Sequence, residues 1–167
     1  KMGSRQLGRV VQRTIEMETY RMMALLSFPV ARATLPKLSS YEDRLVKLAT
    51  EMAATSKAEN LINVTAEDLE MDRNLLSQLT DLAARVEQLS AENRVRFTAA
   101  EAYTDLVKKR IAELKEIPMV GMQTFGEFMD RRLGPAMKTC TWTARRQDEL
   151  AARISRVTQL LRTRVEI

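Results

Sequence analysis

No glycine or proline occurs between Thr65 and Ile117, and this run constrains the fold more than any other feature. Glycine and proline are the strongest local breakers of helices, so their absence predicts an uninterrupted helix over 65–116. Leu, Ala, Glu, Arg, Met and Gln dominate the chain, and all of them are good helix formers. At a rise of about 1.5 Å per residue such a helix would extend roughly 75 Å.

Apolar or small side chains recur every three or four residues along this segment, and Asn93 is the one polar member of the series. The mean step of roughly 3.55 residues is close to the heptad value and predicts a gentle left-handed supercoil with a partner helix. A buried Asn in such a seam fixes register, whereas an Asn on the rim would face water, and both readings stay open. The other members are Leu75, Leu79, Leu82, Val86, Leu89, Phe97, Ala100, Tyr103, Val107, Ile111 and Leu114.

Helix boundaries follow from the breakers and from three capping boxes, in each of which a hydroxyl residue precedes an acid by three positions. Pro29 and Pro36 are expected to bend or end the first helix, and residues 58–64 form a weak break. We predict a single helical domain over 1–167 with four helices, at 5–28, 39–57, 65–116 and 124–166. The capping boxes are Ser39 with Glu42, Thr65 with Asp68, and Thr124 with Glu127.

The predicted fold class is all-α, an elongated helical bundle with a long antiparallel coiled-coil hairpin formed by the last two helices. The first helix carries apolar residues on two stripes, which predicts burial on two sides and a three- or four-helix bundle near one end. The stripes are Leu7, Val11, Ile15, Met22 and Leu26, and Val10, Met17, Ala24 and Phe28.

Composition argues against catalysis and against a bound metal. The chain has no histidine, so the commonest general base and metal ligand are missing. Cys140 is the only cysteine, and we expect a small buried apolar residue rather than a nucleophile. The sequence therefore predicts no enzyme, no cofactor and no small-molecule ligand. It also contains no stretch of roughly 20 apolar residues that would span a membrane.

Charge is unevenly distributed along the chain, whose net charge is +5. The first and last segments are basic and the long middle segment is acidic, which favours helices that pair by complementary charge. The cation clusters at Lys108–Arg110, Arg131–Arg132 and Arg145–Arg146 lie among acidic residues, so salt-bridged surfaces are expected rather than phosphate sites. Nucleic acid is accordingly not an expected partner.

A short connector containing Pro118 and Gly121 joins the two long helices and should turn the chain back on itself. Its tip carries Met119, Val120, Met122 and, beyond it, Phe125. Exposed apolar residues at a tip can dock into a partner or a membrane surface. The alternative is that they fold back and cap the core of the hairpin itself. Together with Gly121, Arg131 and Arg132, these residues are the candidate interaction site.

Two stretches resemble a known family. Residues 16–32 read EMETYRMMALLSFPVAR, and residues 121–146 read GMQTFGEFMDRRLGPAMKTCTWTARR, after which the chain continues to LLRTRV. In this order and spacing they resemble a bacterial family of uncharacterised membrane-anchored proteins, domain of unknown function 3422.

The resemblance implies a longer protein with hydrophobic C-terminal segments that anchor it, and this chain as the helical region before them, on the cytoplasmic side of the membrane. It implies structural or interaction roles, and no catalytic ones, for the matching positions. These are Glu18, Tyr20, Arg21, Arg131, Arg132, Pro135 and Cys140. The basic run Arg153, Arg156, Arg162 and Arg164 fits an approach to anionic lipid.

The sequence and the resemblance together suggest a non-enzymatic helical stalk or scaffold that mediates self-association, through coiled-coil surfaces, or partner binding. One alternative is the cytoplasmic stalk of an oligomeric channel or transporter. Another is a soluble coiled-coil module that binds protein or nucleic acid, which the sequence pI near 9.6 alone supports.

Overall fold

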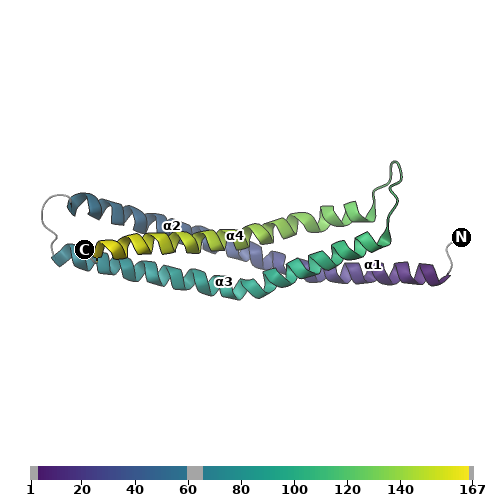
Figure 1. Ribbon diagram of the computed structural model, residues 1–167, viewed down its shortest axis with the longest axis horizontal. Coiled ribbons are helices and arrows are strands. Elements are labelled where there is room, and N and C mark those ends of the chain that lie inside the picture. Colours follow the sequence, from purple (N-terminus) through teal and green to yellow (C-terminus); the bar gives the residue numbers. More distant parts are fainter. Residues whose placement is uncertain (1–3, 60–65, 166–167) are drawn as a thin grey trace. The chain divides into compact units, whose positions relative to one another are not determined.

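The structure is a computed structural model that describes residues 4–59 and 66–165 (Figure 1). Within these ranges the regular structure is entirely α-helical, which confirms the all-α fold class and the helical bundle. The four helices are α1 (Ser4–Leu25), α2 (Ser27–Glu59), α3 (Ala66–Leu114) and α4 (Phe125–Val165).

The chain divides into two compact units, and α2, α3 and α4 each contribute a segment to both. Unit 1 comprises Lys1–Ala33 and Asn93–Thr143, and unit 2 comprises Thr34–Glu92 and Ala144–Ile167. Each unit therefore combines segments of helices that continue into the other unit, and each has its own apolar core.

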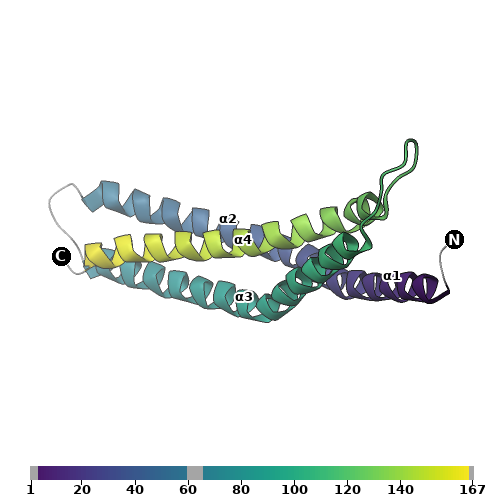
Figure 2. The same cartoon turned by 45° about the vertical axis from the view of Figure 1, so that its right-hand side comes forward.

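In unit 2, segments of α2, α3 and α4 run side by side, with α3 antiparallel to the other two (Figure 1 and Figure 2). Each helix contributes leucine or isoleucine side chains at helical spacing to one shared core. Burying a side chain of this size contributes about 1.5–3 kcal/mol. The core consists of Leu38, Leu45 and Leu48 from α2, Leu75, Leu79, Leu82, Val86 and Leu89 from α3, and Leu150, Ile154 and Leu161 from α4.

In unit 1, α1 packs antiparallel to the second half of α3, and the first half of α4 completes the packing. Ala24 of α1, Val107 of α3 and Leu133 of α4 form the buried centre. The rings of Tyr20 and Tyr103 stack beside it with their centroids 6.1 Å apart. Three helices thus close the core of this unit.

The first helix ends at Leu25, one turn before the position at which Pro29 was expected to interrupt it. Proline has no N–H to donate to the carbonyl four residues earlier, and its ring clashes with that carbonyl. For Pro29 this carbonyl belongs to Leu25, so the break falls there and α2 begins at Ser27. The Ser27 hydroxyl donates to the Ala24 carbonyl at 2.7 Å and satisfies one of the acceptors that the break exposes.

The predicted start of a helix at Ser39 is wrong, because Ser39 lies inside α2. Pro36 also lies inside this helix, on its exposed side, so the chain continues through it despite the lost hydrogen bond. The capping box at Thr65 and most of the expected break over 58–64 lie outside the described residues.

The apolar series on α3 is buried as its spacing predicts. Eight of its positions are buried, and Phe97, Tyr103, Ile111 and Leu114 are half-buried. Asn93 is 5% exposed, so it belongs to the buried series and the alternative of a rim residue facing water is wrong. On α4 the same spacing places Gln147 in the interior, at 3% exposure, between Cys140 and Leu150.

Burial of α1 on two sides is not observed. Met17 and Ala24, from one stripe, are fully buried. The other stripe, from Leu7 to Leu26, is exposed along its whole length. Only one face of α1 is needed to close the core of unit 1, and the second apolar face remains on the surface.

An ion pair joins α2 to α4 in unit 2. The Arg146 guanidinium donates to both carboxylate oxygens of Glu42, with an Nε–Oε1 distance of 2.8 Å, and to the Ser39 hydroxyl. Its hydrogen bonds and charge hold the pKa of Glu42 below the ordinary value of 4.5, although partial burial opposes the shift. The pair therefore contributes stability above pH 4.5 and loses it as the pH falls through the folded-state pKa of Glu42.

We predict that Glu42→Gln lowers the free energy of unfolding at neutral pH and flattens its decline below about pH 4.5. The measurement is urea unfolding, followed by circular dichroism, at a series of pH values. Glu149→Gln, which removes an exposed carboxylate from the same unit, serves as the control and should keep the wild-type pH dependence. Parallel curves for wild type and Glu42→Gln would contradict the prediction.

Candidate interaction surface at the α3–α4 turn

The connection between α3 and α4 is a closed turn. After Leu114 the backbone enters the left-handed region at Lys115, where φ is 49°, and this conformation ends the helix. At the tip the Met122 N–H donates to the Met119 carbonyl at 3.1 Å. Gly121 has a φ of 79°, as the third position of a type II turn requires, and glycine adopts this φ without strain.

Glu116 clasps the start of α4. Its two carboxylate oxygens accept hydrogen bonds from the N–H groups of Phe125 at 2.8 Å and Gly126 at 3.0 Å. These groups belong to the first turn of α4 and have no partner within the helix, and a negative charge is favourable at this positive end of the helix dipole. A Cβ on residue 126 would come within 3.2 Å of the Ile111 side chain, so glycine permits the close approach of the two helices here.

The predicted capping box at Thr124 is confirmed. The Thr124 hydroxyl accepts from the Glu127 N–H at 3.1 Å, and the Glu127 carboxylate accepts from the Thr124 N–H at 3.2 Å. The Phe128 N–H then donates to the Thr124 carbonyl, which begins the regular helical ladder. Together with Glu116, these contacts satisfy every N–H at the start of α4 and make the turn well defined.

The apolar side chains of the tip point into solvent. Ile117, Met119, Val120 and Met122 are 65–107% exposed, and Val120 is the most exposed of them. The alternative in which they fold back over the core of the hairpin is therefore wrong. Figure 2 shows this turn projecting beyond the ends of the two helices that it joins. Exposed apolar groups of this size, concentrated in one turn, form a surface suited to docking.

Below the tip, Phe125 and Phe128 are half-buried and stack with ring centroids 6.2 Å apart. The Arg132 guanidinium lies 4.6 Å from the centroid of the Phe128 ring, a cation–π arrangement that holds its cation beside the aromatic pair. Arg131 is also exposed on α4. Both arginines of the candidate site thus lie on α4, the helix that follows the turn, and Arg132 also packs on the Phe128 ring.

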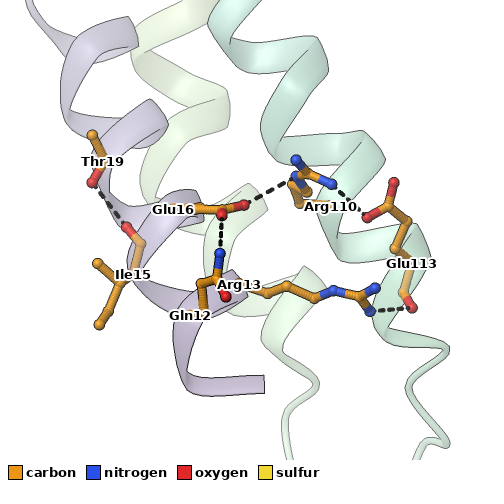
Figure 3. Close-up of polar contacts among 7 residues, drawn as sticks. All are labelled: Gln12, Arg13, Ile15, Glu16, Thr19, Arg110 and Glu113. Carbon is orange, nitrogen blue, oxygen red and sulfur yellow. Dashed lines mark hydrogen bonds and ion pairs between the residues drawn. The ribbon is translucent and has the colours of Figure 1, made fainter. Parts of the chain in front are cut away.

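A cluster of charged residues joins α1 to α3 in unit 1 (Figure 3). Arg110 donates to Glu113 at 2.9 Å and its Nε lies 3.4 Å from a carboxylate oxygen of Glu16. Arg13 donates to the Glu113 carbonyl at 3.4 Å. The Arg110 hydrogen bond lowers the pKa of Glu113, and the same contact raises the pKa of Arg110.

In the remaining cation clusters, Lys108 and Arg146 form ion pairs with acidic residues. Lys108 lies 3.7 Å from Asp105 on the same helix. Arg146 pairs with Glu42 across the helices of unit 2 rather than with Asp148 or Glu149 nearby in the sequence. These contacts agree with the expectation of paired surfaces, although spacing along one helix could not identify the partner from another helix.

Cys140 is buried, as expected for a small apolar residue, and its Sγ lies 3.2 Å from the Ser27 hydroxyl. Burial raises the pKa of its thiol, so the reactive thiolate is disfavoured at neutral pH.

Across 4–59 and 66–165, no three Cys, Asp or Glu residues come together as a metal-binding group. None of the helices in the described part of the chain is both long and apolar enough to cross a bilayer.

Fold and surface together define an all-α helical-bundle protein that presents an apolar turn. The chain belongs to the family described as protein of unknown function (DUF3422), whose family model matches residues 1–167. No curated protein and no solved structure matches the chain.

We predict that Glu116→Ala loosens the start of α4 without unfolding either unit. Amide hydrogen exchange at Phe125 and Gly126 should accelerate roughly fivefold, because a helix cap contributes about 1 kcal/mol. The measurement is exchange followed by NMR, with Glu101→Ala on the exposed side of α3 as the control. Unchanged exchange at both amides in Glu116→Ala would show that the clasp does not stabilise the turn.

Proposed function

We propose that this chain is a non-enzymatic helical scaffold that binds other proteins through the apolar turn between α3 and α4, and that copies of it associate. The observation that carries the proposal is the exposure of Ile117, Met119, Val120 and Met122 on a turn that Glu116 and Thr124 hold in one conformation. A pre-formed apolar surface binds at a lower entropic cost than a flexible loop.

The chemistry of the tip favours a protein partner. Two of the four side chains are methionines, whose flexible, polarisable thioethers adapt to the shape of an apolar pocket. The flanking cations of Arg131 and Arg132 suit a pocket with an acidic rim. The absence of histidine from the sequence supports a binding role rather than a catalytic one.

We further propose that the chain belongs to a bacterial, membrane-anchored protein and lies on the cytoplasmic side. The support is the resemblance of residues 16–32 and 121–146 to that family, which implies hydrophobic segments beyond the helical region. In this arrangement the anchor holds the scaffold near the membrane, and the turn recruits its partner there.

The partner-binding role predicts that a photoreactive amino acid at Val120 of the native full-length protein cross-links to a discrete partner protein in living cells. Val120 is suited to this because its side chain is fully exposed and makes no contact that the replacement would break. Adducts are detected by gel shift and identified by mass spectrometry.

The control places the same photoreactive residue at Glu101, which is exposed on α3 away from the turn. A second variant adds Met119→Ser and Met122→Ser, which should abolish the Val120 adduct while leaving the helical content unchanged. Equal labelling from Val120 and Glu101, or adducts that consist only of lipid, would overturn the protein-docking role.

The membrane-anchored role predicts that the native full-length protein stays in the membrane pellet after an alkaline carbonate wash. This treatment strips peripheral proteins, whereas inserted apolar segments remain because their transfer to water is unfavourable. Release into the soluble fraction would contradict the anchor and would leave the docking role to stand on the turn alone.

A further inference from the structure

The exposed stripe of α1 forms an apolar face along the helix, with polar residues at its middle. Leu7, Val11, Ile15, Met22 and Leu26 are 50–62% exposed, and Val10 and Met23 flank them at about 40%. The opposite side of the helix is anchored through Arg13 and Glu16 to α3, and Figure 3 shows Ile15 and Thr19 pointing away from that contact. The face is therefore presented by a helix that is already packed on its other side.

We propose that this face of α1 binds the same face of a second copy of the chain, with the two helices antiparallel. The inference rests on the proposed scaffold function and names the surface through which copies associate. It commits to a symmetric pair because six of the seven apolar positions pair with one another when the helix is reversed, and Ile15 alone lies opposite a polar residue. In an antiparallel pair Leu7 lies opposite Leu26, and Val11 lies opposite Met22.

The polar groups within the face do not oppose this burial. Thr14 and Thr19 donate their hydroxyl hydrogens to the carbonyls of Val10 and Ile15, each at 2.9 Å, so no hydroxyl donor loses its partner when the face is covered. Glu18, which lies opposite Ile15 of the second copy, is already paired with Arg21 at 2.7 Å. Its aliphatic stem can pack against the isoleucine while the carboxylate stays neutralised.

Charge selects the antiparallel orientation. Arg5 and Arg9 lie near the start of α1, whereas residues 22–31 carry no charge. A parallel pair would align these arginines with their own copies, at a cost in repulsion. In the antiparallel pair they lie beside the uncharged end of the other helix, and the like charges are separated.

The area is sufficient for a specific dimer of modest affinity. Seven apolar side chains that each cover about 80 Å² on burial give about 1,100 Å² over both copies, which exceeds the roughly 1,000 Å² expected of a biological interface and lies just below the roughly 1,200 Å² at which stable interfaces begin. The side chains of Thr14, Glu18 and Thr19 add to this area as the polar middle of the face.

The first test is sedimentation equilibrium of the whole chain. The proposal predicts that the wild-type chain sediments as a species of twice the 19.1 kDa monomer mass. Ile15→Glu should convert this dimer to monomer, because the new carboxylate would be buried at the centre of the face. Val95→Glu, which replaces another exposed apolar residue of unit 1, should leave the dimer intact. A monomeric wild type, or a dimer that Ile15→Glu does not weaken, would overturn the proposal.

The second test reports orientation and does not depend on a destabilising charge. In a Cys140→Ser background, chains with Val11→Cys are mixed with chains with Met22→Cys under oxidising conditions. Antiparallel pairing predicts disulfides almost entirely between unlike chains. A parallel pair gives like-to-like disulfides, and random encounters give a statistical mixture in which about half of the disulfides join like chains. Either of these outcomes overturns the proposed geometry. Failure of both tests alongside a specific Val120 adduct would refute this interface and retain the scaffold function.

Discussion

Burial of one apolar face of α3 is the constraint on which both units depend. Its buried residues, from Leu75 to Val107, form a single series along the helix. Part of this series contributes to the core of unit 2, and part contributes to the core of unit 1. A seam between two helices covers only a narrow strip, so each unit recruits a third helix. Unit 2 uses α2 for this purpose, and unit 1 uses α1.

The turn between α3 and α4 depends on polar contacts rather than on the core. Glu116 and Thr124 satisfy the first N–H groups of α4, and Gly121 permits the reversal of the chain at the tip. Because these contacts define the turn without help from its apolar side chains, Val120 and its neighbours are free to face solvent. An exposed apolar surface is therefore compatible with a turn that polar contacts define, and in our proposal this exposure makes the turn a binding surface.

Helix α1 carries more apolar residues than the core of unit 1 buries. Met17 and Ala24 fill the core of unit 1, whereas the stripe from Leu7 to Leu26 is left uncovered. Charged anchors at Arg13 and Glu16 hold the helix in place, and the hydroxyls on the exposed side are satisfied locally. Such a face is costly to leave in water, which is the physical reason to seek its complement on a second copy.

The sequence by itself determined the fold class, the long helix α3, the burial of its apolar series and the capping box at Thr124. These features follow from local chemistry, namely breakers, periodicity and the hydrogen bonds of a helix end. It also singled out the residues of the turn as a candidate interaction site.

Only the tertiary structure decided the rest. The inclusion of Pro36 and Ser39 within α2, the burial of Asn93, the exposure of the tip and the uncovered face of α1 all depend on how the segments of the chain pack. So do the Glu42–Arg146 pair and the Glu116 clasp. Periodicity shows that a face is apolar, but whether a neighbour covers that face depends on how the helices pack, and no local pattern encodes that.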